Sequence, residues 1–369
     1  MIGYIDSSSF PVYTYGEMFI YPGLYSYYMS WTPTSLSGYF RIYDSSLSSY
    51  SSYLFNDYDG LFTDKDGFGS YLGYRTFESV GITTLETNAE FVSSYATTNC
   101  SLLKKIYLPN CRFIGTAAFE SAKSLEYISI PVCDEIYEFA FTNTAVSSLV
   151  LPECSVIRDN AFDGCARLSY ISAKKCTDIR YGAFKNCKSL STAYVPSVEV
   201  IWFDAFRSCI NLKYINMKSC TDIMGFAFNE CQKLVAISVP YLKRIGDCAF
   251  LDCMALSTVS LPAVLYINDQ AFGNCNSLKS VYISGVCSYI GNLAFNSCSK
   301  LSAITLNLSN VCKLSTDEYI SAGLHFANTP IESGTGRIYV RSSLVKAYKS
   351  ASFWSEYSSQ IYPINNQKY

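Results

Sequence analysis

The chain offers little material for acid–base catalysis, because its 369 residues include one histidine, His325. A single histidine excludes multi-histidine metal sites and leaves one candidate for a histidine-dependent catalytic triad. No Gly-x-Ser-x-Gly motif is present to supply a nucleophile for such a triad. We therefore predict that His325 is structural or solvent-facing and that the protein is not an enzyme.

Cysteine is the second residue type capable of chemistry, with 16 copies between Cys100 and Cys312. No Cys-x-x-Cys pair is present, so a zinc site lacks its usual ligand spacing. Most of the cysteines occupy two fixed positions of a repeat described below: Cys100, Cys165, Cys187, Cys209, Cys231, Cys253, Cys275 and Cys298 the first, and Cys111, Cys133, Cys154, Cys176 and Cys220 the second. Side chains at one position of stacked repeats run parallel, which is poor disulfide geometry. We predict buried free thiols, with disulfides and metal ligation as the alternatives.

Two acidic runs, residues 57–60 and 64–67, carry the Asp-x-Asp-Gly pattern of some calcium loops. An EF-hand loop would require a further aspartate two residues before each run, where the chain has Phe55 and Phe62. Turns rich in aspartate and glycine explain both runs without a metal. We therefore expect no metal site and no cofactor.

Charge and hydropathy exclude two further classes of function. The formal net charge is −2, which argues against a nucleic-acid partner held by long-range charge. No run of 18 apolar residues is present, so we predict no membrane insertion. The first residues also lack the basic and apolar regions of a secretory signal.

The elements that must position these residues come from a repeat of about 22 residues. An Ala-Phe pair marks each copy, with successive spacings of 22, 21, 22, 22, 22, 22, 22 and 23 residues. The phenylalanines are Phe119, Phe141, Phe162, Phe184, Phe206, Phe228, Phe250, Phe272 and Phe295. Cysteine follows three residues later, leucine six later, and an aliphatic residue nine later in most copies.

A period of this length predicts a solenoid of short parallel strands. The segment from Leu168 to Cys176 alternates apolar and polar residues around Ile171, which is typical of one strand. Glycine, asparagine and aspartate before the Ala-Phe pair supply the turn. No repeat can bury its apolar residues alone, but stacking makes their columns continuous. We predict an α+β repeat protein, a leucine-rich-repeat solenoid of about ten repeats with a C-terminal helical cap.

The repeated unit, well seen from Ile245 to Pro262, resembles that of the BspA-like leucine-rich repeat family. The resemblance covers about residues 97–364, because residues 338–361 are similar to the closing segment of such proteins. It implies adhesion or protein binding, usually on a cell surface, and it implies no catalytic residues. Residues 1–80 match no family pattern.

Composition near residue 80 and the resemblance of the closing segment divide the chain into three predicted domains. Residues 1–80 are rich in tyrosine and serine and lack cysteine, and we predict a small β-rich domain for self-assembly or docking. Residues 81–337 form the solenoid and residues 338–369 the cap. In the cap, Ser342 or Ser343 is expected to N-cap a helix whose apolar face is Leu344, Ala347, Tyr348, Ala351 and Trp354. This helix would cover the last open strand, an edge otherwise prone to pairing with other chains.

The outward positions of the strands, eight and ten residues after each phenylalanine, are the candidate binding surface. They carry small, hydroxylated or tyrosine side chains, and Lys105 and Tyr107 extend them toward the N-terminus. Tyrosine offers a large rigid contact area with a polar tip, as in adaptable protein-binding surfaces. The alternative is that tyrosine and threonine are simply good strand formers. The candidate binding residues are Tyr107, Tyr127, Tyr170, Tyr194, Tyr214 and Tyr282.

Together these patterns predict a non-enzymatic binding or adhesion protein that recognises a protein or glycan on a cell surface. The alternative is a bacteriophage virion component, a fibre or head decoration that presents the repeats to a host. The location expected is therefore extracellular, on a cell surface or on a virion.

Overall fold

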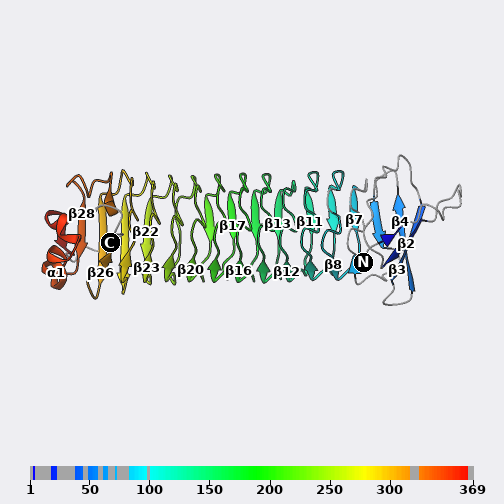
Figure 1. The fold of residues 1–369 in the computed structure, drawn as a ribbon, viewed down its shortest axis with the longest axis horizontal. Coiled ribbons are helices and arrows are strands. Elements are labelled where there is room, and N and C mark those ends of the chain that lie inside the picture. Colours follow the sequence, from blue (N-terminus) through cyan, green and yellow to red (C-terminus); the bar gives the residue numbers. More distant parts are fainter. Residues whose placement is uncertain are drawn as a thin grey trace. The chain divides into compact units, whose positions relative to one another are not determined.

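The computed structural model describes residues 83–97, 100–315 and 324–364, together with the backbone of six short strands between residues 3 and 72 (Figure 1). The chain divides into two compact units, Met1–Lys174 and Lys175–Tyr369. Within the described part, no helix is long and apolar enough to cross a membrane.

Most repeats contribute two short strands, and most of these strands pair in parallel with their counterparts in the next repeat. In the first unit the first strands are β7 (Thr84–Glu86), β9 (Lys105–Tyr107), β11 (Tyr127–Ser129), β13 (Ser148–Val150) and β15 (Tyr170–Ser172). The second strands are β6 (Tyr71–Leu72), β8 (Phe91–Val92), β10 (Phe113–Ile114), β12 (Glu135–Ile136) and β14 (Val156–Ile157). The partners lie about one period apart, as in Tyr127 opposite Lys105, so the repeat length sets the register.

The second unit continues both series. Its first strands are β17 (Thr192–Tyr194), β19 (Tyr214–Asn216), β22 (Thr258–Leu261), β24 (Ser280–Gly285), β26 (Ala303–Leu308), β28 (Arg337–Val340) and β29 (Ile361–Pro363). Its second strands are β16 (Asp178–Ile179), β18 (Val200–Ile201), β20 (Asp222–Ile223), β21 (Arg244–Ile245), β23 (Tyr266–Ile267), β25 (Tyr289–Ile290) and β27 (Lys313–Leu314). Five second strands in one unit and seven in the other make about twelve turns, against the ten predicted. The two additional turns are those of strands β6 and β27, which lie outside the regular Ala-Phe series.

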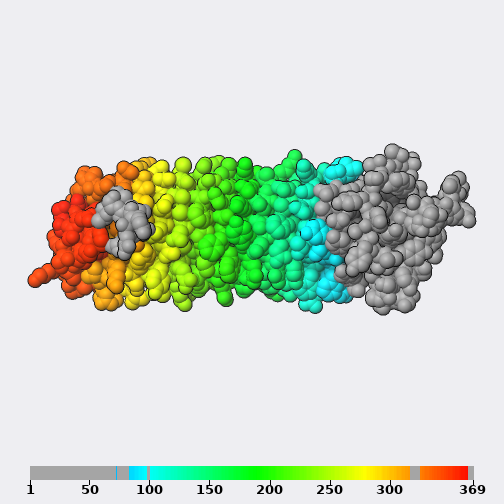
Figure 2. Space-filling model, viewed as in Figure 1, coloured from blue at the N-terminus to red at the C-terminus, as the bar shows by residue number. Residues whose placement is uncertain are grey.

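The core of each unit is a set of identical residues stacked along the repeats. The nine repeat phenylalanines have no exposed surface, and neighbouring rings stack with centroids 5.1–5.5 Å apart within each unit. This separation is close to the spacing of paired strands, about 4.8 Å, because one ring belongs to each turn. In the space-filling view, successive repeats of each unit lie side by side in chain order (Figure 2). The predicted phenylalanine, cysteine and leucine columns are confirmed as core, as is the aliphatic column except at Ile237.

Two positions flanking each phenylalanine have left-handed backbone. One lies two residues before it, as in Leu293 (φ 54°), and the other two residues after it, as in Asn274 (φ 57°). Gly182 and Gly164 occupy these two positions in other repeats, with φ of 58° and 70°. The chain must reverse direction sharply on both sides of the ring, and a positive φ accomplishes each reversal.

The ladder of first strands is interrupted in two places within the described residues. In the first unit it breaks between β11 and β13, where the repeat from Phe141 to Phe162 is 21 residues long. The second-strand ladder is continuous there, because β12 pairs with β14. In the second unit it breaks between β19 and β22, and Ile237, expected at an inward position, is only half-buried. The repeat length is normal at this second break, and nothing in the structure explains it.

The C-terminal cap comprises the 3-10 helices η2 (Ser342–Leu344) and η3 (Trp354–Gln360) around a short helix, α1 (Val345–Ser350). Neither Ser342 nor Ser343 caps the helix: α1 begins after Leu344, without a side-chain cap. Ala347 is exposed, and the burial is concentrated in Tyr348 and Trp354. The predicted long apolar helix face was therefore wrong, since one and a half turns of helix can present only a few side chains to the core.

The cap covers the last turn through two aromatic anchors. The Trp354 Nε1 donates a hydrogen bond to the Cys312 carbonyl oxygen at 2.7 Å, and the Tyr348 hydroxyl accepts one from the Cys312 backbone N–H at 3.1 Å. Their rings meet edge to face, with centroids 5.2 Å apart. The cap thus satisfies backbone groups that no further repeat is present to pair.

The strands before residue 65 are β1 (Gly3–Tyr4), β2 (Met18–Pro22), β3 (Gly38–Asp44), β4 (Ser49–Asn56) and β5 (Leu61–Asp64). Strands β3, β4 and β5 pair antiparallel in sequence, and β5 then pairs in parallel with β7. The rest of residues 1–80 lies outside the described residues, so the N-terminal domain stays a prediction. The predicted boundaries after residues 80 and 337 also stay predictions. The two acidic runs also lie outside them, apart from the backbone of Asp64.

Candidate functional site

Three of the predicted tyrosines lie on the first strands of the first unit and point away from its core. Tyr107 and Tyr127 occupy neighbouring strands, with ring centroids 5.2 Å apart and planes tilted by 42°. Tyr127 keeps 46% of its surface exposed and Tyr170 keeps 39%, whereas Tyr107 is half-buried. Ser148, a small residue, is the Cα partner of Tyr170. Paired strands therefore hold all three tyrosines.

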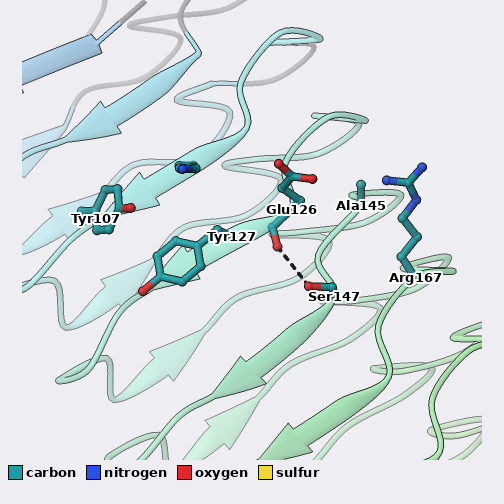
Figure 3. A pocket seen from close by; sticks show the side chains of 7 residues that line it. Tyr107, Glu126, Tyr127, Ala145, Ser147 and Arg167 are labelled. Carbon is teal, nitrogen blue, oxygen red and sulfur yellow. Dashed lines mark hydrogen bonds between the residues drawn. The ribbon is translucent and has the colours of Figure 1, made fainter. Parts of the chain in front are cut away.

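A hollow of about 470 Å³ adjoins Tyr107 and Tyr127. Its lining combines these two rings with two cations, one carboxylate and two small side chains: Lys105, Tyr107, Glu126, Tyr127, Ala145, Ser147 and Arg167. In Figure 3 the tyrosine rings lie at one end of this group and Arg167 at the other. The Ser147 hydroxyl donates a hydrogen bond to the Glu126 backbone carbonyl at 3.5 Å. Sequence reasoning missed Glu126, Ala145, Ser147 and Arg167, and the signal that could have found them is the 21-residue spacing after Phe141.

The second unit holds another tyrosine pair on adjacent strands. Tyr214 is 53% exposed and Tyr194 is 36% exposed, with Thr192 and Asn216 as their respective Cα partners. The Oδ1 atom of Asn216 is buried and has no hydrogen-bond partner among the described residues. The structure thus brings Tyr194 and Tyr214 together on one strand face.

Tyr282 is tied into a polar network and is half-buried. The Asn307 Nδ2 donates to its hydroxyl at 3.0 Å, and the Arg341 Nε donates to the Asn307 Oδ1 at 2.8 Å. The strand register places Tyr339 and Tyr362 in the same column as Tyr282. Sequence reasoning missed these two tyrosines, because the irregular 31-residue interval from Phe295 to Phe326 precedes them.

Among the first-strand positions ten residues after each phenylalanine, the predicted exposure is wrong at two. Ser172 is 6% exposed and Thr305 is 6% exposed. Thr305 lies between Tyr282 and Tyr339 in the register, and these larger side chains flank it. These two small residues are therefore covered, whereas Ser238 and Ser260 at the same repeat position are exposed.

All sixteen cysteines are buried and present as free thiols. At the first position the thiol donates to the carbonyl of the phenylalanine one repeat back, as Cys165 does to Phe141 and Cys209 to Phe184, both at 3.1 Å. At the second position it donates to the carbonyl two residues later, as Cys220 does to Asp222 at 3.4 Å. Burial raises the pKa of the Cys165 thiol to about 11 and that of Cys220 to about 12. These thiols serve packing, because a protonated buried thiol is a poor nucleophile and metal ligand.

His325 is buried at 2% exposure, which agrees with a structural role. Its Nε2 lies 2.9 Å from the Ser315 carbonyl oxygen, and its Nδ1 has no partner among the described residues. Burial lowers its pKa, so the ring is neutral near pH 7. Over the described ranges, no group of three histidine, cysteine or acidic side chains could hold a metal ion.

Short parallel strands, stacked phenylalanines and a covering cap define a leucine-rich-repeat solenoid, a class in which strand faces present side chains to partners. The model of the BspA type leucine rich repeat region matches residues 66–134, 90–213 and 199–322 in six copies. The chain belongs to this family.

One solved structure supports the fold, and two more are similar at lower TM-scores. A leucine-rich repeat protein from Bacteroides ovatus is similar at 21% identity and a TM-score of 0.51, over 80% of this chain and 87% of that one. A leucine rich cell surface protein from Faecalibacterium prausnitzii is 17% identical with a TM-score of 0.38, over 89% and 95% of the two chains. The pneumococcal vaccine antigen PcpA is 19% identical with a TM-score of 0.37, over 77% and 78%. A search of curated proteins finds no match.

Proposed function

We propose that this chain is a non-enzymatic binding protein whose first strands recognise a protein or glycan partner on a cell surface. The observation that carries the proposal is the set of tyrosines held outward by paired strands, of which Tyr127 and Tyr214 are the most exposed, at 46% and 53%. Such rings are pre-organised, because neither backbone nor strand spacing must change on binding.

Exposure favours binding over mere strand formation. A tyrosine retained only for its strand propensity gains stability by packing its ring on neighbours. Tyr170 and Tyr194 instead keep more than a third of their surface free, beside serine, threonine or asparagine partners. Exposed rings above small polar neighbours suit contacts with an external surface.

The setting on a cell surface rests on the family to which the chain belongs. The virion setting, the alternative predicted from the sequence, stays a prediction that no feature of the described residues favours. Strand-face recognition is the same in both settings, so the test below does not depend on the choice.

The test replaces Tyr127, Tyr170, Tyr194 and Tyr214 together by serine. We expect attachment of fluorescently labelled protein to a panel of cells and to a glycan array to be lost. The thermal midpoint should move by only a few degrees, because exposed strand positions in other repeats already carry serine. Truncating aromatic anchors usually costs about 2 kcal/mol or more of binding energy each.

A matched control replaces three exposed tyrosines that lie away from the first strands. Tyr181, Tyr241 and Tyr266 are 43%, 63% and 44% exposed, and their serine variant should attach like the wild type. Retained attachment by the folded quadruple variant would contradict the proposal, as would equal loss in the control.

A further inference from the structure

One repeat of the first unit is a residue short, and its consequences are local. The turn after Phe141 has only Ala145 where the flanking repeats have two residues, Lys123-Ser124 and Ala166-Arg167. Compared with its neighbours, this repeat lacks one residue just before β13, between the core positions held by Thr144 and Val146. Everything that follows it is displaced by one position relative to the preceding repeat.

The first-strand ladder absorbs this missing residue. The Ser147 N–H donates to the Glu126 carbonyl at 3.4 Å, whereas the equivalent bond one repeat on, from Ser169 N–H to the Ser147 carbonyl, measures 2.9 Å. The second-strand pairing of β12 with β14 is kept, since Glu135 and Val156 remain Cα partners. The strands therefore separate on one side only, and the hollow opens beside Ala145 and Ser147.

The charges around the hollow are available to a ligand. Lys105, Glu126 and Arg167 are all exposed, and within the described part of the chain none of the three forms an ion pair. Two cations against one carboxylate leave a net positive charge, which favours an anion. The arginine fork in particular matches the two oxygens of a carboxylate.

Glu126 decides between kinds of anion. A simple anion or an acidic peptide side chain has no hydroxyl donor for this carboxylate and would be repelled by it. A sugar acid carries hydroxyl donors as well as a carboxylate, so it can satisfy Glu126 and the cations together. Its ring can lie against Tyr107 and Tyr127, and a volume of about 470 Å³ falls among small-ligand pockets, which span about 300–1,000 Å³.

We propose that the short repeat creates a binding site for a carboxylate-bearing sugar, held between the rings of Tyr107 and Tyr127 and the cations Lys105 and Arg167. This proposal rests on the proposed function and names the ligand class for one part of the strand face. It makes an irregularity of the repeat the source of specificity.

The test titrates N-acetylneuraminic acid and glucuronic acid into the full chain at millimolar concentration, followed by ligand-observed NMR and calorimetry. Glucose serves as the uncharged sugar for comparison, and an aspartate tripeptide serves as the acidic peptide. We expect both acids to bind and both other probes to fail. Arg167→Gln should weaken binding by about tenfold to a hundredfold, the value of a charge-assisted hydrogen bond.

The control is Lys300→Gln, which removes an exposed cation from the same position of another repeat, five residues after its phenylalanine. It should bind the sugar acids like the wild type. A second variant inserts one serine between Ala145 and Val146, which restores a 22-residue repeat and should abolish binding with the fold intact.

Failure of both acids to bind, equal binding of glucose, preferential binding of the peptide, or unchanged binding by Arg167→Gln would each overturn the proposal. These outcomes are separable from failure of the proposed function. The quadruple tyrosine variant tests attachment by the whole strand face, whereas Arg167→Gln leaves all four of its tyrosines in place.

Discussion

At the scale of single residues, cysteine solves a packing problem that recurs in every turn. The side chain three residues after each phenylalanine faces a small apolar space, and it also faces the carbonyl of the previous phenylalanine. A thiol fills the space as a small hydrophobe and donates weakly to that carbonyl, as Cys231 does to Phe206 at 3.2 Å. Alanine would leave the carbonyl without this donor. This position accounts for half of the 16 cysteines, and none of them requires a disulfide.

This arrangement predicts thiols that are present but unreactive. In denaturant, nearly all 16 thiols should react with a chromogenic disulfide reagent without prior reduction. In the native protein few should react, because burial raises the pKa of thiols such as Cys111, to about 12, and excludes the reagent.

Cys287 and Cys312 test the same arrangement under oxidation, because their Sγ atoms lie 3.7 Å apart. Oxidation should join this pair before any other, as peptide mapping would reveal. If most of the 16 thiols failed to react in denaturant, the assignment of the cysteines to the core would be contradicted.

At the scale of elements, the phenylalanine stack makes the repeats depend on their neighbours. Phe206 lies between Phe184 and Phe228, with centroids 5.3 Å from each, and has no exposed surface. Its backbone N–H also donates to the Ala227 carbonyl at 2.8 Å, so ring and backbone bind the same neighbouring turn. The stack therefore couples adjacent turns more than it stabilises any one of them.

Phe206→Ala should lower the free energy of unfolding by about 3–5 kcal/mol, since it leaves a cavity that stacked turns cannot close. Denaturant titration followed by circular dichroism measures the loss. Phe203→Ala is the matched control, because Phe203 lies three residues away and is 47% exposed. A Phe206 variant no less stable than the Phe203 variant would contradict the role of the stack.

At the scale of the whole molecule, the ends differ from the repeats between them. The C-terminal end is covered by Tyr348 and Trp354, both fully buried. At the other end β7 pairs with β5, so parallel pairing continues into the tyrosine-rich segment before residue 81. We propose for residues 1–80 the docking or self-assembly role that their composition predicts.

A shortened chain of residues 81–369 should stay folded, because each repeat contacts mainly its neighbours. It should lose oligomerisation or anchoring, as measured by light scattering and by localisation. A chain of residues 60–369, which keeps β5, controls for loss of the strand that pairs with β7. Full-length size and localisation in both shortened chains would contradict the docking role.

The sequence by itself determined the repeat, its core columns and the class of fold. A period near 22 residues places identical side chains at the same point of every turn, so one pattern read nine times predicts Phe119 and Phe295 alike. Burial of these columns is decided locally and repeatedly, which is why the sequence predicted it well.

Only the tertiary structure decided what the irregularities do. The 21-residue spacing after Phe141 was visible in the sequence, but either strand ladder could have absorbed it. In the structure β12 stays paired with β14, whereas β11 and β13 are not paired, and the hollow adjoins this break. The burial of Thr305 and the half-burial of Tyr282 likewise depend on neighbours a full turn away. Such contacts join residues that no short window of sequence contains, and they follow from the balance of packing and pairing across turns.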